Sequence, residues 1–152
     1  MPASTGAQDT VPVVRPRAKT FEYGASLDRA GRLHGEDDAT LELDESWSPE
    51  HLVLAALMRC TLTSLRYHAG RVGIDDLVAS ATAHGRVTKR EEDERYAFVE
   101  ITCDLDVEFE PVSDVDVAEL VAKAERDCFV GASLTAKPRY AWRVNGREIE
   151  QH

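Results

Sequence analysis

The three cysteines are the residues of this chain that are best suited to covalent chemistry. None of them belongs to a Cys-x-x-Cys pair or lies at zinc-finger spacing from a histidine, and the five histidines are scattered, so no metal site is predicted. An odd number of cysteines also argues against a complete disulfide framework. What remains is thiol chemistry by some of the cysteines, or burial of each as a small apolar residue.

Cys103 belongs to the most regular strand pattern in the sequence. Apolar and polar residues alternate over residues 99–109, and Cys103 falls on the apolar face between Ile101 and Leu105. A free cysteine in such a position behaves as a small hydrophobic side chain, so we expect Cys103 to lie in the core.

Cys60 lies within a long predicted helix that begins at Ser48-Pro49-Glu50. Ser48 can cap this helix, Pro49 suits its first position, and the carboxylate of Glu50 faces the positive end of the helix dipole. The segment is rich in leucine and alanine and continues to about Arg71, where glycines on either side end it. We therefore expect a helix that is buried on most sides and carries Cys60 near its middle.

Cys128 closes the apolar stripe of a second predicted helix. This helix is expected to open at residues 111–113, Pro-Val-Ser, with Asp116 completing a capping box. Its stripe consists of Val117, Leu120, Val121, Ala124 and Cys128. If the two helices pack together, Cys60 and Cys128 can point into one pocket. The alternative is that they are two unrelated core cysteines, and sequence spacing alone does not decide between the two.

The remaining patterns predict a mixed α+β fold. Strands are expected at residues 21–27, 33–43, 77–87, 99–109 and 134–144, with a turn at residues 28–31, an exposed hairpin loop at residues 89–95, and Gly131 loosening the chain before the last strand. This order of elements differs from a regular βαβ alternation. A length of 152 residues fits a single domain over residues 18–152, preceded by a flexible arm at residues 1–17.

Charge and hydropathy argue against some classes of partner and against secretion. The formal net charge is −10, and an acidic surface repels both nucleic-acid phosphates and anionic membranes. The longest apolar run, residues 52–58, is too short to span a bilayer, and residues 1–17 lack the apolar region of a secretory signal. We therefore expect a cytoplasmic protein without nucleic-acid or membrane partners. Cysteines are normally reduced there, so a cysteine pair is more often catalytic, redox-sensing or metal-binding than a static disulfide.

Two segments resemble the OsmC and organic hydroperoxide resistance (Ohr) family. Residues 48–60, SPEHLVLAALMRC, resemble the signature in which a Pro-Glu pair opens a helix that carries the reactive cysteine about three turns further on. Residues 124–134, AERDCFVGASL, resemble the helix that ends in the second cysteine of the family, followed by a short turn and the last strand. The order of elements is similar over residues 20–144, which is nearly all of the chain except the arm.

The resemblance implies an OsmC-like fold, with antiparallel sheets around two central helices, in an intertwined homodimer with two active sites at its interface. It implies an organic hydroperoxide reductase without a metal or a bound organic cofactor. Cys60 would attack the peroxide and become a sulfenic acid, which Cys128 would convert to a disulfide. An arginine from the N-terminal hairpin, best matched by Arg29, would lower the pKa of Cys60, and Glu50 would hold that arginine. A lipoamide-like dithiol would reduce the disulfide, and apolar pocket walls would favour alkyl or fatty-acid hydroperoxides over hydrogen peroxide.

Four features depart from the pattern of the family, one of which is Arg59, directly before Cys60 where small residues are common. The connection from Arg29 to Glu50 is shorter, so Arg32 competes with Arg29 for the role of the arginine. Trp47 precedes the helix where a glycine-rich approach is usual, and Phe129 follows the second cysteine where many members have proline. Two other functions therefore stay open: an OsmC-like module that binds an apolar small molecule, and a redox sensor that uses the same disulfide.

Overall fold

A computed structural model describes Pro12 and residues 18–150 of the chain. The arm expected at residues 1–17 lies outside the described residues, except for Pro12. The chain divides between Asp44 and Glu45 into two compact units. The expectation of one domain over residues 18–152 stays a prediction.

The first unit holds three antiparallel strands of two residues each, in the order β1 (Ser26–Leu27), β2 (Leu33–His34), β3 (Thr40–Leu41). The strand expected at residues 21–27 is therefore wrong except for its last two residues, and the one expected at 33–43 is two short strands around a turn. Nearly all side chains of residues 18–44 are exposed, so little apolar burial supports longer strands in this unit.

Asp28 organises the turn predicted after β1. Its Oδ1 accepts hydrogen bonds from the backbone N–H groups of Ala30 at 2.9 Å and Arg32 at 3.0 Å, and its Oδ2 lies 2.8 Å from Nε2 of His34. The contact with His34 and the backbone bonds hold the pKa of Asp28 below its ordinary value. Gly31 completes the turn with a φ of +85°, which glycine adopts without strain.

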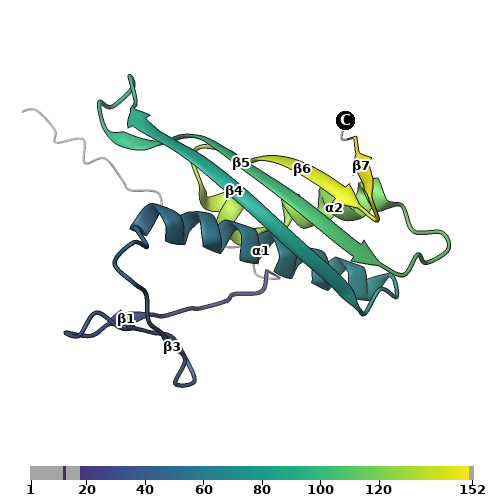
Figure 1. The fold of residues 1–152 in the computed structure, drawn as a ribbon, viewed down its shortest axis with the longest axis horizontal. Helices are drawn as coiled ribbons and strands as arrows, with labels where there is room; N and C mark the ends of the chain where they lie inside the picture. Colours follow the sequence, from purple (N-terminus) through teal and green to yellow (C-terminus); the bar gives the residue numbers. More distant parts are fainter. Residues whose placement is uncertain (1–11, 13–17, 151–152) are drawn as a thin grey trace, which may run out of the picture. The chain divides into compact units, whose positions relative to one another are not determined.

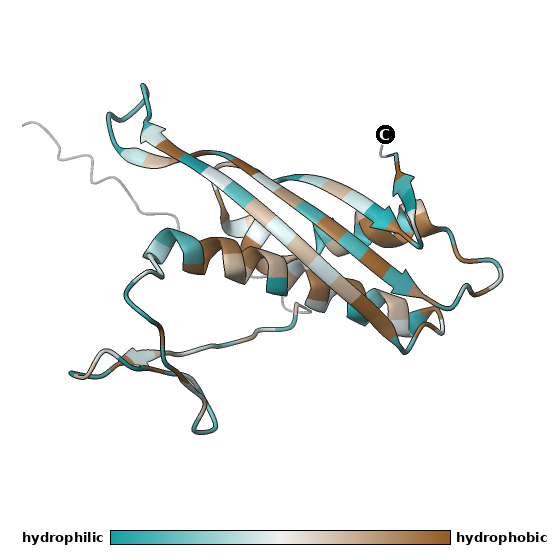
Figure 2. Ribbon diagram, viewed as in Figure 1, coloured by the Kyte–Doolittle hydropathy of each residue, from teal (hydrophilic) through white to brown (hydrophobic). Residues whose placement is uncertain are grey.

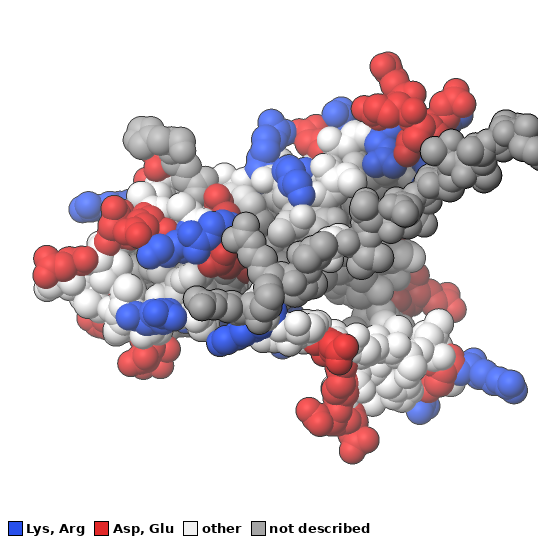
Figure 3. Space-filling view, turned by 180° about the vertical axis from the view of Figure 1, so that it is seen from behind, with Lys and Arg blue, Asp and Glu red and all other residues white. Residues whose placement is uncertain are grey.

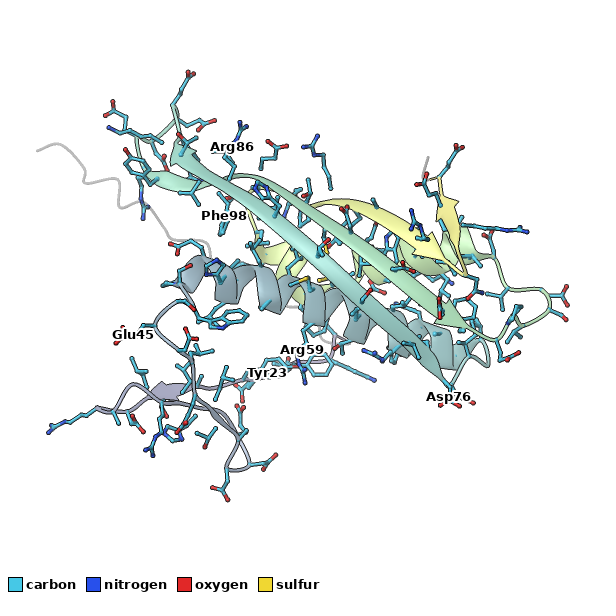
Figure 4. The ribbon with its side chains drawn as sticks, viewed as in Figure 1. Tyr23, Glu45, Arg59, Asp76, Arg86 and Phe98 are labelled. Atoms are coloured by element: carbon cyan, nitrogen blue, oxygen red, sulfur yellow. The ribbon has the colours of Figure 1, made fainter. Side chains whose placement is uncertain are left out.

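The second unit begins with α1 (Pro49–Arg71), which confirms the helix predicted from Ser48 to about Arg71. Oγ of Ser48 accepts a hydrogen bond from the backbone N–H of His51 at 3.2 Å, and Nδ1 of His51 accepts one from the backbone N–H of Ser48 at 3.0 Å. After the helix, Gly73 has a φ of +87°, and the chain turns near Asp76 into the sheet (Figure 4).

Four strands form the sheet of the second unit, in the order β4 (Leu77–Lys89), β5 (Tyr96–Phe109), β6 (Arg139–Val144), β7 (Arg147–Ile149). Strands β4 and β5 confirm two predicted strands and the loop between them. Strand β6 pairs with β5 in parallel, while the other two pairs are antiparallel, so the expectation of antiparallel sheets is wrong at one pair. The strand that was expected from residue 134 is β6, which begins at Arg139. Strand β7 was not predicted.

Helix α2 (Val117–Arg126) starts later than predicted. Asp116 caps it, with its Oδ1 accepting a hydrogen bond from the backbone N–H of Glu119 at 3.2 Å, so the expected cap at residues 111–113 is wrong. Asp114 has a left-handed φ of +66°, which prevents a helix from running through that position. A short helix, α3 (Phe129–Ser133), follows, and Gly131 lies inside it rather than in a loosened segment.

The core of the second unit lies between one face of the sheet and the helices α1 and α2, which contact each other and the sheet (Figure 1). Figure 2 shows the alternation of apolar and polar residues along β5, whose apolar positions point into this core. The fully or almost fully buried apolar side chains are Leu57, Leu65, Ala69, Ile74, Ile101, Cys103, Leu105, Val107, Leu120, Val121, Ala124, Cys128, Trp142 and Val144.

The described surface is mixed in charge. Lys and Arg side chains lie interspersed with Asp, Glu and uncharged residues on the face shown in Figure 3. Among the described residues, no helix combines the length and the apolar character that crossing a membrane requires.

Candidate thiol site

The structure brings Cys60 and Cys128 together. Cys60 lies in the interior of α1 and is partly exposed, whereas Cys128 lies between α2 and α3 and is fully buried. The Cys128 thiol lies close enough to raise the pKa of the Cys60 thiol, and both thiols are free. Of the two possibilities left open by the sequence, the structure therefore has the two cysteines as neighbours, while the roles of the two sulfurs stay a prediction.

Three groups surround the sulfur of Cys128. The backbone N–H of Gly131 donates to Sγ at 3.3 Å, and Oγ1 of Thr61 lies 3.4 Å from it. The Thr61 hydroxyl also lies 2.9 Å from the backbone oxygen of Leu57. Because a hydroxyl has a single hydrogen, Thr61 donates to one of these acceptors at a time.

Tyr140, on β6, is the third neighbour of Cys128. A Cβ atom built on Gly131 would lie 2.8 Å from Oη of Tyr140 and 3.4 Å from Sγ of Cys128, so the hydroxyl and the sulfur flank the same glycine. Burial raises the pKa of the Tyr140 hydroxyl, and the neighbouring Thr61 lowers it by a smaller amount. Negative charge on Cys128 or Cys103 would raise this pKa further.

Cys103 faces the same region from the sheet. It lies opposite Tyr140 in the register of β5 and β6, and its side chain is fully buried, which confirms the expectation of a core position. Burial raises the pKa of its thiol to about 12, with smaller contributions from Asp104, Cys128 and Glu125. Cys103 therefore stays protonated at neutral pH and is a poor nucleophile.

The electrostatic surroundings of Cys60 do not favour its thiolate. Burial raises the pKa of the Cys60 thiol, and the neighbouring Cys128 raises it as well, while the backbone N–H groups of Val130 and Phe129 lower it. Among the described residues, the groups with the largest effects on this pKa include no cation. Arg59, which precedes Cys60, extends from the face of α1 that is turned away from the sheet (Figure 4). Lowering this pKa would take a positive charge or further hydrogen-bond donors near the sulfur.

Glu50 lies in the first turn of α1 and is exposed. Its backbone N–H and the hydroxyl of Ser48 lower the pKa of its carboxyl group. Glu50 and Cys60 are ten residues apart on one helix, which corresponds to about 15 Å along the helix axis. A glutamate side chain does not bridge that distance, so Glu50 does not contact Cys60 of its own chain.

Both candidate arginines belong to the first unit. Arg29 is exposed in the turn after β1, and Nε of Arg32 forms an ion pair with Glu42 at 3.0 Å, also on the surface. They lie in a different compact unit from Cys60 and Glu50, and the role of either arginine beside the thiol stays a prediction.

A histidine–aspartate pair ties α1 to the residue before Cys128. Nε2 of His68 lies 2.7 Å from Oδ2 of Asp127, and Arg126 contacts the same carboxylate. Arg126, and then His68, lower the pKa of Asp127 to about 2. This pair fixes the end of α2 against α1 and so helps to position Cys128.

Thr61 and Tyr140 were not predicted as site residues from the sequence, and Gly131 was predicted only to loosen the chain before the last strand. Thr61 follows Cys60 directly, and the sequence does not show that its hydroxyl contacts Cys128. Tyr140 lies on the more buried face of β6, but strand alternation does not reveal which helix residue it contacts. No group of three or more His, Cys, Asp or Glu residues within the described ranges could hold a metal ion.

Comparison with known proteins identifies the fold and the family. A sequence model described as OsmC-like protein matches residues 42–143, about two thirds of the chain, whereas no curated protein matches. An OsmC-like protein of unknown function from Vibrio cholerae has a TM-score of 0.62 at 12% identity, covering 82% of this chain and 99% of that one. A putative organic hydroperoxide resistance protein from Vibrio cholerae, solved with captopril in one of its active sites, has a TM-score of 0.58 at 17% identity, covering 89% and 99%.

An organic hydroperoxide resistance protein from Legionella pneumophila has a TM-score of 0.51 at 20% identity, covering 83% of this chain and 96% of that one. At such identities the solved structures establish a common fold. The match to the family model, with the two cysteines placed side by side, adds the membership: the chain belongs to the OsmC-like family.

Proposed function

We propose that the protein is a thiol peroxidase that reduces organic hydroperoxides to alcohols. The observation that carries this proposal is the pairing of a partly exposed thiol, Cys60, with a fully buried one, Cys128, at the contact of α1 and α3. A partly exposed thiol can meet a peroxide, and an adjacent buried thiol can resolve the oxidised product. Family membership and the hydroperoxide resistance proteins among its structural neighbours support the same function.

The reaction balances with one dithiol consumed per peroxide. The Cys60 thiolate attacks the terminal oxygen of ROOH, the O–O bond breaks, and the alkoxide leaves with a proton as ROH. Cys128 then attacks the sulfur of the Cys60 sulfenic acid, which forms the disulfide and releases water. A lipoamide-like dithiol returns both cysteines to thiols and becomes a cyclic disulfide.

The described residues of one chain do not account for the activation of Cys60. The raised pKa of Cys60 calls for a guanidinium nearby, and we assign this role to Arg29, held by Glu50. Since Glu50 lies about 15 Å along α1 from the Cys60 of its own chain, we place Glu50 beside Cys60 of a second copy. The active protein would then be a homodimer with each site built from both chains.

The exposed aromatic and aliphatic side chains of the first unit support such a dimer. Phe21, Tyr23, Leu27 and Leu41 are 57%, 77%, 68% and 50% exposed. Exposed apolar residues in this density are typical of a surface that another chain covers. A cover over Cys60 would also supply the apolar walls that favour alkyl hydroperoxides. We propose the cytoplasm as the compartment, because the mechanism needs reduced cysteines, and all three are free here.

A single-turnover thiol count tests this function. Reduced protein is treated with one equivalent of cumene hydroperoxide, and the remaining thiols are titrated. We expect the parent to lose two thiols, Cys60→Ser to lose none, and Cys128→Ser to be trapped as a sulfenic acid. Cys103→Ser is the matched control and still loses two. Survival of all three thiols in the parent would refute the peroxidase.

A second function has one observation in its favour. The pKa of the Cys60 thiol is raised rather than lowered, as expected for a module that binds an apolar small molecule without turnover. Arg29→Gln separates the two, with Arg32→Gln as its control. Slower oxidation of Cys60 in Arg29→Gln alone supports the peroxidase with Arg29 as the activating residue. A disulfide that forms without repeated turnover would instead indicate a redox sensor.

A further inference from the structure

Cys128 caps the short helix α3, and its sulfur has two hydrogen-bond donors within reach. Its sulfur is fully buried, yet the backbone N–H of Gly131 and the hydroxyl of Thr61 lie 3.3 and 3.4 Å from it. A neutral thiol is a weak acceptor and needs no such donors. A thiolate is a stronger acceptor, and in a buried position it is stable only with hydrogen bonds of this kind.

The Tyr140 hydroxyl is a candidate for a third donor. In the described chain, only two buried side-chain oxygens lack a hydrogen-bond partner, Oη of Tyr140 and Oγ of Ser64. Leaving a buried hydroxyl without a partner is unfavourable, so Tyr140 requires an explanation. The hydroxyl lies across Gly131 from the Cys128 sulfur, where a charged sulfur would accept its hydrogen.

The two sulfurs differ in access to solvent. Cys60 is partly exposed and Cys128 is fully buried, so an incoming reductant reaches Cys60. Attack at Cys60 expels Cys128 as the leaving group, and the rate of thiol–disulfide exchange depends on the stability of the leaving thiolate. The donors therefore surround the sulfur that becomes negatively charged in this step.

We propose that Thr61, Gly131 and Tyr140 form a leaving-thiolate site that directs the reductant to Cys60 and accelerates opening of the disulfide. A thiolate of the reductant attacks Sγ of Cys60, a mixed disulfide forms, the Cys60–Cys128 bond breaks, and its electron pair stays on Cys128. The hydroxyl of Thr61 turns from the Leu57 carbonyl to this sulfur, and Tyr140 donates to it. The second thiol of the reductant then releases Cys60 as the cyclic disulfide forms. The inference rests on the proposed function in that it assumes a Cys60–Cys128 disulfide.

The test separates opening of the disulfide from its formation by peroxide. The disulfide is formed with diamide, which oxidises neighbouring thiols without any peroxidase activity. Its reduction by excess dithiothreitol is followed by stopped flow in the parent, Tyr140→Phe and Thr61→Val. Two variants serve as controls. Tyr96→Phe removes the hydroxyl of a tyrosine that is 76% exposed. Thr63→Val removes a hydroxyl that donates to the backbone oxygen of Arg59 at 2.8 Å, just as the Thr61 hydroxyl donates to that of Leu57.

We expect Tyr140→Phe and Thr61→Val each to slow reduction by about 10-fold, the effect of losing one hydrogen bond to a charged group. Thr61→Ser, which keeps the hydroxyl, restores the parental rate, and the two controls reduce at that rate. The ratio of the reduction rate to the rate of Cys60 oxidation by cumene hydroperoxide falls in both variants, which a general loss of structure does not produce.

Unchanged reduction in both variants, or the absence of a diamide disulfide, overturns the proposal. If peroxide leaves the thiols intact while the diamide disulfide opens as expected, the peroxidase function fails and the leaving-thiolate site stands.

Discussion

Replacing Gly131 by alanine tests the packing around Cys128. Gly131 is buried inside α3, and a Cβ at this position would meet Oη of Tyr140 at 2.8 Å, Sγ of Cys128 at 3.4 Å and Cδ1 of Leu57 at 3.5 Å. Real Cβ atoms are not found within 3.0 Å of another heavy atom, so the first contact forces the tyrosine to move. Gly70→Ala is a matched control, because Gly70 also lies in a helix and a Cβ there meets nothing within 4 Å.

The expected magnitudes follow from two opposing effects. Alanine favours a helix over glycine by about 0.5–1 kcal/mol, so Gly70→Ala is expected to stabilise the protein by that amount. Gly131→Ala gains the same preference but overpacks the core at a cost of about 1–3 kcal/mol, which leaves a net loss of about 1 kcal/mol. The two variants therefore differ by about 2 kcal/mol, or about 4–8 °C in Tm for a chain of this size.

Urea unfolding followed by circular dichroism measures the difference. A double-mutant cycle identifies its cause, because Tyr140→Phe removes the one atom that lies within 3.0 Å of the new Cβ. In the Tyr140→Phe background, Gly131→Ala is expected to recover about 1 kcal/mol or more, whereas Gly70→Ala and Tyr140→Phe are additive. Equal stabilisation by both alanines in the parent, or additivity at Gly131, would show that Tyr140 does not pack on Gly131.

Two further predictions concern the contacts that position Cys128. Asp127 has its pKa lowered to about 2, first by Arg126 and also by His68, so the folded pKa lies below the unfolded one. The ionised Asp127 carboxylate therefore stabilises the folded protein above about pH 4, and this stabilisation is lost as the pH falls towards 2. In urea titrations, the stability difference between the parent and Asp127→Asn is expected to shrink over that range. A constant difference would argue against the ion pair. Leu57→Ala leaves a cavity at a fully buried position next to Gly131 and is expected to lower the free energy of unfolding by about 2–5 kcal/mol. The control Val78→Ala, at a site that is 73% exposed, is expected to change it by less than about 0.5 kcal/mol in the same titration. Similar losses of stability in both variants would contradict the assigned core.

Local signals in the sequence were sufficient for the elements that depend on local interactions. The start of α1 was predicted because Ser48 and Pro49 act within one helical turn, and β5 because its apolar alternation is uninterrupted. The start of α2 was missed because two capping residues compete there. Asp116 prevails over Ser113, since the chain reverses at Asp114.

The sequence pattern did not predict which distant segments pair with each other. The parallel register of β5 and β6 and the presence of β7 depend on contacts between residues far apart in the chain, which alternation does not encode. In the first unit, alternation over residues 21–27 predicted a strand where the structure has only two paired residues, because few of its side chains are buried.

The sequence by itself determined the helical position of Cys60, the burial of Cys103 and, through its resemblance to a family, the choice of Cys128 as the partner thiol. Only the tertiary structure decided that the two sulfurs meet, because their approach depends on how α3 packs against α1. It also decided which groups surround Cys128: Thr61 comes from one helix and Tyr140 from a strand, and a one-dimensional pattern carries no record of the distance between them. The physical reason is that helix and strand periodicities arise from neighbouring residues, whereas a site arises from packing between elements.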